Sequence, residues 1–217
     1  MSSNIDYTSP ATQFTYDLND NTLFKKNNHN FINVLGINQL NTLENVSLLD
    51  IFLSAGNVIE PHYHQHAAEL VYCISGACTV SFLNPFTKEI QNYPITSGQV
   101  ANVPQGWWHY IEATADNTHF LGIFDAPTPE VILGSDLLTL TPANIMAYTY
   151  GMDKKQWEKA IASIKPALFI GPPGDQKGAN VNANVNININ DPDPQYIDQY
   201  ADQMYPYTHQ NRPNFPL

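Results

Sequence analysis

Short apolar runs separated by turn residues dominate the middle of the chain. Between Val46 and Asp125, segments such as VSLLDIFL, ELVYCI, CTVSFL and THFLGIF alternate with Gly, Pro and Asn residues at close spacing. Runs of this length, bounded by turn residues, are typical of β-strands. The pattern predicts an all-β fold, an antiparallel sandwich or barrel, and not strands that alternate with helices.

A helical pattern follows this β-rich region. The segment TPANIMAYTYG begins with Thr141 and Pro142, a good pair for an N-cap and a first helical turn. The segment DKKQWEKAIASIKP places Asp153 and Gln156 at the spacing of a capping box. The sequence therefore predicts two short helices after the barrel.

The two ends of the chain differ in composition from its middle. The N-terminal part is polar and rich in Asn, and we expect it to wrap the domain as an arm or to stay partly mobile. In NVNANVNININ, residues 180–190, Asn alternates with Val, Ala or Ile, which fits an edge strand and a disordered low-complexity tail about equally. We divide the chain into an N-terminal arm (1–40), a β-barrel (41–135), a helical extension (136–170) and a low-complexity tail rich in Asn, Pro and Tyr (171–217).

Composition and charge exclude several classes of partner. The chain has 217 residues, 43% of them hydrophobic, which is enough for one domain with a core. Its 9 Lys and Arg residues stand against 20 Asp and Glu, so we expect neither a nucleic acid nor a membrane as partner. The N-terminus has no basic start followed by an apolar run. It does not read as a signal peptide, and we expect a soluble protein, cytoplasmic by default.

Metal-binding residue types gather in two segments. Residues two apart in a strand point to the same face, so His62 and His64 share a face. Glu69 opens the next strand, from which its carboxylate can return toward the two imidazoles. His109 enters a further strand after a Pro- and Gly-containing turn. Such a mixed nitrogen and oxygen site leaves positions on a six-coordinate ion open for water, dioxygen or substrate.

The same two segments match two motifs of the cupin superfamily. The first motif, G-x5-H-x-H-x4-E-x6-G, is met at Gly56, His62, His64, Glu69 and Gly76. The second, G-x5-P-x-G-x2-H, is met at Gly98, Pro104, Gly106 and His109, while Ala113 stands where that motif ends in Asn. Two motifs in the right order make the resemblance specific.

The resemblance implies a double-stranded β-helix, a jelly-roll barrel, with one divalent metal ion per chain. His62, His64, Glu69 and His109 would hold the ion. Mn or Fe is favoured, and Zn, Ni, Cu and Co are compatible with the same ligands. His66 lies too close in sequence to Glu69 to replace His62 in the motif, so we interpret it as a loop or rim residue.

Over residues 45–170 the order of parts resembles one half of an oxalate decarboxylase and the germin-like proteins. Those decarboxylases carry an arginine three residues before the first metal histidine, and germin-type oxidases carry an asparagine, whereas this chain has Ile59. The family's proton-donating lid glutamate falls near Glu130, which is the candidate catalytic residue. Without a cation at position 59, we expect oxalate itself to be a poor substrate.

These features predict a metal-dependent oxidoreductase or lyase, such as an oxidase, dioxygenase or decarboxylase, acting on a small organic acid or similar small molecule. The alternative is a structural or storage-type cupin, in which the metal stabilises the barrel and the tail mediates assembly. A third hypothesis is a small-ligand sensor, although we find no attached DNA-binding module. We also expect a homo-oligomer, because barrel edges and the alternating tail can pair with another copy.

Overall fold

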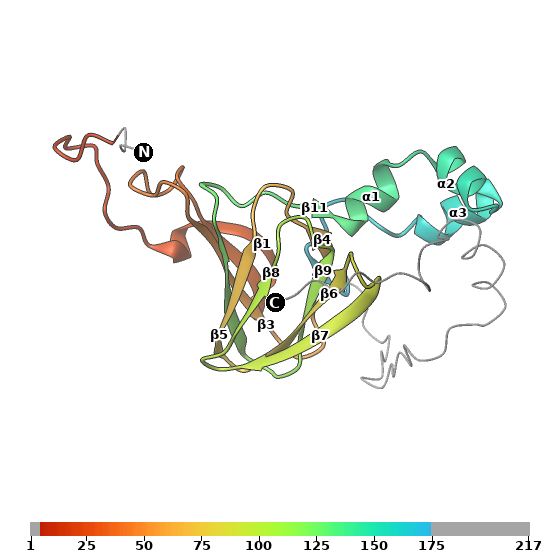
Figure 1. Ribbon diagram of the computed structural model, residues 1–217, viewed down its shortest axis with the longest axis horizontal. Helices are drawn as coiled ribbons and strands as arrows, with labels where there is room; N and C mark the ends of the chain where they lie inside the picture. Colours follow the sequence, from red (N-terminus) through yellow and green to blue (C-terminus); the bar gives the residue numbers. More distant parts are fainter. Residues whose placement is uncertain (1–4, 175–217) are drawn as a thin grey trace, which may run out of the picture. The chain divides into compact units, whose positions relative to one another are not determined.

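Two antiparallel β-sheets form a barrel in the computed structural model, which describes residues 5–174 (Figure 1). The first sheet has the order β1 (Thr22–Asn27), β2 (Asn30–Leu35), β3 (Ser47–Leu53), β10 (Thr118–Phe124), β5 (Glu69–Ser75) and β8 (Val100–Val103). The second has the order β11 (Ile132–Leu133), β4 (Val58–Tyr63), β9 (His109–Ala113), β6 (Ala77–Asn84) and β7 (Glu89–Thr96), and β12 (Ile170–Gly171) also pairs with β4. Strands distant in sequence lie side by side, as in a jelly roll, and the predicted fold class is confirmed.

Apolar side chains fill the space between the two sheets. Along β10 every second residue is buried, and the residues between them are partly exposed. This period of two is expected of a sheet with one face in a core. The buried cluster includes Ile32, Ile51, Leu53, Val71, Val80, Ile111 and Phe120. Since removing apolar surface from water contributes about 25 cal/mol per Å², this packing is the main source of barrel stability.

The first two strands lie in the segment that we expected to form an arm. That prediction is wrong for residues 22–35, where β1 and β2 form a hairpin that extends the first sheet. The polar composition did not indicate strands, because asparagines of this segment are buried and hydrogen-bonded inside the fold. Asn30 is 4% exposed, and its amide oxygen accepts a hydrogen bond from the Ser54 N–H at 2.8 Å. Asn33 is 1% exposed and donates to the Asp50 carboxylate at 3.4 Å.

Within residues 5–174, three short helices, and not two, follow strand β11: α1 (Gly134–Leu140), α2 (Ala143–Thr149) and α3 (Lys154–Ile161). The expected cap of α3 is present, because the Asp153 carboxylate accepts a hydrogen bond from the Gln156 N–H at 2.9 Å. The expected cap of α2, by contrast, is absent. Thr141 ends α1 instead, and Pro142 takes the N-cap position of α2 without a side-chain hydrogen bond.

Helix α1 was not predicted, because a residue distant in sequence stabilises its first turn. Glu60 on β4 is 6% exposed, and its carboxylate accepts hydrogen bonds from the Ser135 N–H at 2.8 Å and the Ser135 hydroxyl at 3.0 Å. The same carboxylate accepts from the Phe169 N–H at 2.9 Å. Glu60 thus fastens both α1 and the segment before β12 to the barrel, and no local sequence pattern announces this contact.

Candidate metal centre

Four polar side chains meet inside the barrel. His62 ends the inward-facing part of β4, and it lies opposite His109, the first residue of β9. His64 follows β4, and Glu69 begins β5 in the other sheet. The exposed fractions of these four residues are 3% or less. One ligand atom from each residue lies within 4.8 Å of the others, so the structure brings together the residues that the two motifs single out.

Backbone carbonyls fix the orientation of the three imidazoles. The Nδ1 atoms of His62, His64 and His109 lie 2.6 Å, 2.7 Å and 2.9 Å from the carbonyl oxygens of Glu60, Glu130 and Trp107, respectively. A carbonyl oxygen only accepts, so each Nδ1 carries the proton and each Nε2 of a neutral ring carries a lone pair. This is the arrangement by which outer partners usually orient histidine ligands of a metal. The sequence contains no signal for these backbone carbonyl partners.

The Nε2 atoms of His64 and His109 lie close to the Glu69 carboxylate. Its Oε2 lies 2.9 Å from His109 Nε2 and 3.3 Å from His64 Nε2. His64 Nε2 is buried and has no hydrogen-bond partner within residues 5–174. Lone pairs that face an anion in a dry interior are costly unless a cation lies between them.

Electrostatics in the cluster favour that cation. Burial would raise the pKa of Glu69, but hydrogen bonding and charge from His109 and His64 hold it below its ordinary value, so the carboxylate is ionised. Burial and the neighbouring His109 hold the pKa of His62 well below 6.5, so this ring is neutral. Although burial opposes it, Glu69 raises the pKa of His64. The neutral His62 ring and the ionised Glu69 carboxylate are in the protonation states that metal binding requires, and a bound cation would take the place of the positive charge that Glu69 favours on His64.

The spacing also fits a first-row ion. Two ligand atoms about 2.1 Å from one ion can lie at most about 4.2 Å apart, and neighbouring ligands lie about 3 Å apart. The distances within the cluster reach this range with a contraction of less than an ångström. The donor set of three imidazoles and one carboxylate suits a divalent transition metal.

A small cavity of about 40 Å³ adjoins the cluster. It touches His62, His64 and Glu69, and its other walls are Leu23, Ile32, Leu49, Ile51, Ile59, Ile111, Pro129, Val131, Leu133 and Phe169. Within residues 5–174, no lysine or arginine lines it. The space is enough for one or a few water molecules. Any group that binds there meets an apolar wall on every side except that of the cluster.

The remaining candidate residues lie outside the cluster. The exposed Glu130 carboxylate accepts a hydrogen bond from the Gln65 amide at 2.9 Å, and Glu130 is not among the cavity walls. Its carbonyl oxygen, and not its carboxylate, contacts a cluster histidine. His66 Nε2 donates to the Thr128 carbonyl at 2.7 Å. The structure therefore does not bring Glu130 or His66 into the group of four.

A match to a protein family shows which family the chain belongs to. The family described as Cupin matches residues 18–158, well over half of the chain. The chain is a cupin. Both sequence motifs and all four cluster residues lie within the matched part of this cupin.

Plant proteins are among the sequence relatives of this cupin. Germin-like protein subfamily 2 member 4 of Arabidopsis thaliana is 29% identical over 140 residues, which cover 62% of this chain and 63% of the relative. Germin-like protein subfamily 2 member 1 of the same species is 32% identical over 123 residues, covering 54% and 55%. Glycinin G3 of Glycine max is 22% identical over 120 residues, which cover 54% of this chain and 25% of the relative. The cupin thus spans less than two thirds of these relatives.

Solved structures of oxalate decarboxylases share the fold. The enzyme from Bacillus subtilis superposes with a TM-score of 0.63 at 22% identity, covering 79% of this chain and 48% of that one. The enzyme from Lactobacillus farciminis gives a TM-score of 0.62 at 22% identity, covering 80% and 54%. At this identity the likeness concerns the fold alone.

In residues 5–174, no helix is long and apolar enough to cross a membrane.

Proposed function

We propose that this cupin is a metal-dependent oxidoreductase or lyase acting on a small organic acid or a similar small molecule. The observation that carries the proposal is the approach of the His64 and His109 Nε2 atoms to an ionised, buried carboxylate beside a cavity, with His62 as a third imidazole in the same group. One divalent ion, with Mn or Fe favoured, would be held by His62, His64, Glu69 and His109. The manganese centres of Bacillus subtilis oxalate decarboxylase, which shares the fold, support this choice of ion.

The bound ion would supply a Lewis acid with positions open to substrate. The residues of the chain orient the imidazoles and exclude water. The carbonyl oxygens of Glu60, Trp107 and Glu130 keep each imidazole in one tautomer and one orientation. The apolar cavity walls exclude bulk water, which strengthens electrostatic interactions with any polar group bound there.

The cavity walls suit a substrate with little charge. Ile59, which stands where related enzymes carry arginine or asparagine, is 6% exposed and lines the cavity. Burying a second carboxylate against Ile59 and Ile111 would leave it without a donor, at a cost of several kcal/mol. We therefore expect oxalate, a dianion, to be a poor substrate, and a neutral or singly charged acid or an enediol to be a better one.

We retain Glu130 as a candidate proton shuttle. Its carboxylate can reach the cavity only after the hydrogen bond to Gln65 breaks, although Pro129 and Val131 on either side already line the cavity. Glu130→Gln should lower turnover at least about 100-fold if it transfers a proton. Metal content should stay unchanged, because the bond to His64 comes from the backbone. Gln65→Ala should leave turnover within a few fold.

A structural or storage-type cupin is the second candidate. The observation in its favour is the size of the cavity, about 40 Å³, which holds water more readily than an organic acid. In that case the ion would stabilise the barrel without turnover. A homo-oligomer is expected under both hypotheses, and light scattering coupled to size exclusion measures it.

A dioxygen and carbon dioxide screen separates the two candidates. The protein is stripped with a chelator, reloaded anaerobically with Mn or Fe, and supplied with small carboxylic acids and enediols, with oxalate as a separate sample. Substrate-dependent dioxygen uptake or carbon dioxide release that disappears in His109→Ala supports the proposed enzyme. A fully loaded centre without turnover of any compound, and with a melting temperature that falls on chelation, would instead support the structural cupin.

A further inference from the structure

Strand β10 contributes no residue to the metal cluster, yet one of its glycines lies directly against it. Gly122 is buried on the inner face of β10. A Cβ atom built on Gly122 would overlap Oε1 of Glu69 and would lie 3.4 Å from its carboxyl carbon. Real Cβ atoms essentially never approach another atom below 3.0 Å. The Glu69 carboxylate therefore occupies the space that any side chain at this position would need.

The backbone alone does not require glycine here. Gly56, Gly76, Gly98 and Gly106 have positive φ angles between 73° and 83°, whereas Gly122 lies outside that left-handed region and within a regular strand. A glycine inside a strand weakens it and commonly marks a close approach by another group. At Gly122 the approaching group is the carboxylate of the only acidic residue in the cluster.

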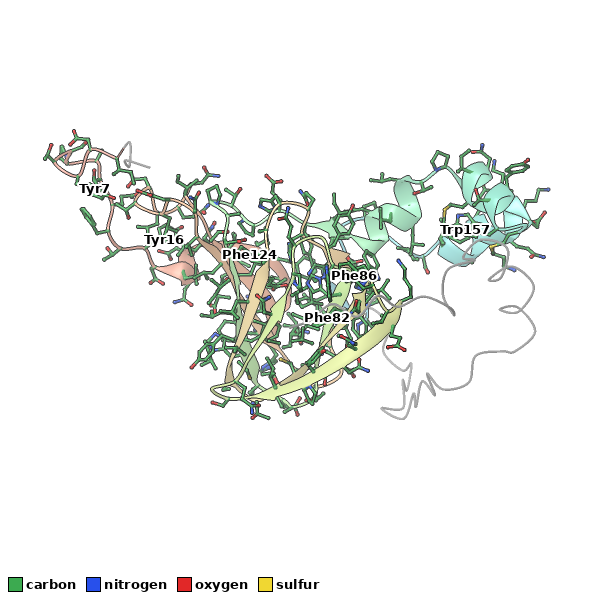
Figure 2. The ribbon with its side chains drawn as sticks, in the orientation of Figure 1. Tyr7, Tyr16, Phe82, Phe86, Phe124 and Trp157 are labelled. Atoms are coloured by element: carbon green, nitrogen blue, oxygen red, sulfur yellow. The ribbon has the colours of Figure 1, made fainter. Side chains whose placement is uncertain are left out.

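The strand register explains how the two residues meet. Gly122 pairs with Val71 across β5, and Glu69 pairs with Phe124, so Glu69 and Gly122 are diagonal neighbours on the same inner face. A diagonal neighbour lies within reach of a long side chain. Phe124, labelled on the barrel in Figure 2, is fully buried and also contacts the cluster, because its ring packs edge-on against His64 with centroids 4.6 Å apart. Hence β10 shapes the position of two cluster residues without supplying a ligand.

The carboxylate has little freedom to move away from an added methyl group. Glu69 is 2% exposed, and its other oxygen is enclosed between His109 Nε2 at 2.9 Å and His64 Nε2 at 3.3 Å. Displacing Oε1 to an ordinary contact distance would rotate or shift Oε2 as well. Ligand distances in metal sites are expected to lie within about 0.2 Å of standard values, so such a shift of the carboxylate matters.

We propose that Gly122 is a positioning residue that sets the place of the Glu69 carboxylate and thereby the affinity of the centre for its ion. The inference rests on the proposed metal site. Gly122 acts through Glu69 alone, and it touches neither the ion nor the substrate.

The test is manganese(II) binding to the full-length, chelator-stripped protein, measured by calorimetry and by electron paramagnetic resonance of the bound ion. Gly122→Ala should weaken binding about 10- to 100-fold, the usual effect of removing support behind a ligand, and should change the spectrum of bound manganese. Phe120→Leu is the matched control. It alters the same inner face of β10 two residues away and should lower the melting temperature without changing the affinity.

A double-mutant cycle shows whether Gly122 acts through Glu69. In the Glu69→Ala background, Gly122→Ala should leave the residual affinity of the three histidines unchanged within about twofold. If Gly122→Ala alone does not fold, Glu69→Ala/Gly122→Ala should fold, because the added methyl then enters vacated space. Parent-like manganese affinity in Gly122→Ala, equal losses in both backgrounds, or failure of the double variant to fold would each overturn the inference. Absence of manganese binding in the parent would instead contradict the metal site itself.

Discussion

Glu60 and Glu69 are two buried carboxylates on the barrel that meet opposite surroundings. Glu60 faces donors only, since two N–H groups and a hydroxyl point at it from the junction with the helical extension. Glu69 faces the Nε2 atoms of His64 and His109, two imidazoles whose Nδ1 protons are donated to backbone carbonyls on the far side of each ring. The first carboxylate is satisfied by the protein itself, whereas the second is satisfied only by a cation. The comparison separates a structural anchor from a binding site without reference to any relative.

The largest expected effect is loss of the ion from the barrel interior. His64→Ala and His109→Ala would each remove a proposed ligand and should weaken manganese binding by more than about 100-fold, beyond the effect of changing an outer partner. Metal analysis after dialysis measures this directly. His66→Ala is the matched control from the same segment. It should keep parent metal content, and a site emptied by His66→Ala as fully as by His64→Ala would show that the ligands are wrongly assigned.

Glu60→Ala should destabilise the fold while leaving the ion in place. The substitution leaves the Ser135 and Phe169 N–H groups without an acceptor, and each buried unsatisfied group costs about 1–3 kcal/mol. We expect a loss of about 3 kcal/mol in the free energy of unfolding, measured by urea denaturation. Ser135→Ala removes only the hydroxyl and should cost about 1 kcal/mol.

In the stripped protein, Glu69→Ala should cost less than Glu60→Ala, because it removes an anion that lacks a partner other than the imidazoles. The order of the two losses is the sharpest form of the comparison. An equal or greater loss for Glu69→Ala in the absence of metal would mean that its carboxylate is already well satisfied by the protein.

The smallest expected effect concerns the helical extension itself. Asp153→Ala removes the side-chain acceptor for the Gln156 N–H at the start of α3 and should cost about 1 kcal/mol. Circular dichroism during thermal unfolding measures the loss. Manganese affinity should not change, and a change would show that α3 is coupled to the barrel interior.

The parts of the fold that could be predicted from the sequence are those with a local physical cause. Strands β3, β5 and β10 were predicted from short apolar runs bounded by turn residues, and the four cluster residues from the spacing of two motifs. Hairpin β1–β2 was missed because Asn30 and Asn33 find their partners in the tertiary structure. Helix α1 was missed for the same kind of reason, since Glu60 lies far from it in sequence.

The outer partners of the cluster were equally beyond prediction. The carbonyl groups that orient the imidazoles carry no sequence signal, because every residue has one. The reason for a glycine at position 122 lies in the Glu69 side chain on a neighbouring strand. Such features depend on strand register, which single-sequence patterns do not specify for strands so far apart.

Manganese titration of the stripped parent protein, followed by calorimetry and thermal unfolding, measures whether the barrel interior binds an ion. We expect one ion per chain and a melting temperature that rises with manganese concentration, because binding to the folded state alone stabilises it. Both effects should vanish in Glu69→Ala/His109→Ala and persist in Glu60→Gln. No saturable binding by the parent, or binding that survives in Glu69→Ala/His109→Ala, would contradict the assignment of the ion to this cluster.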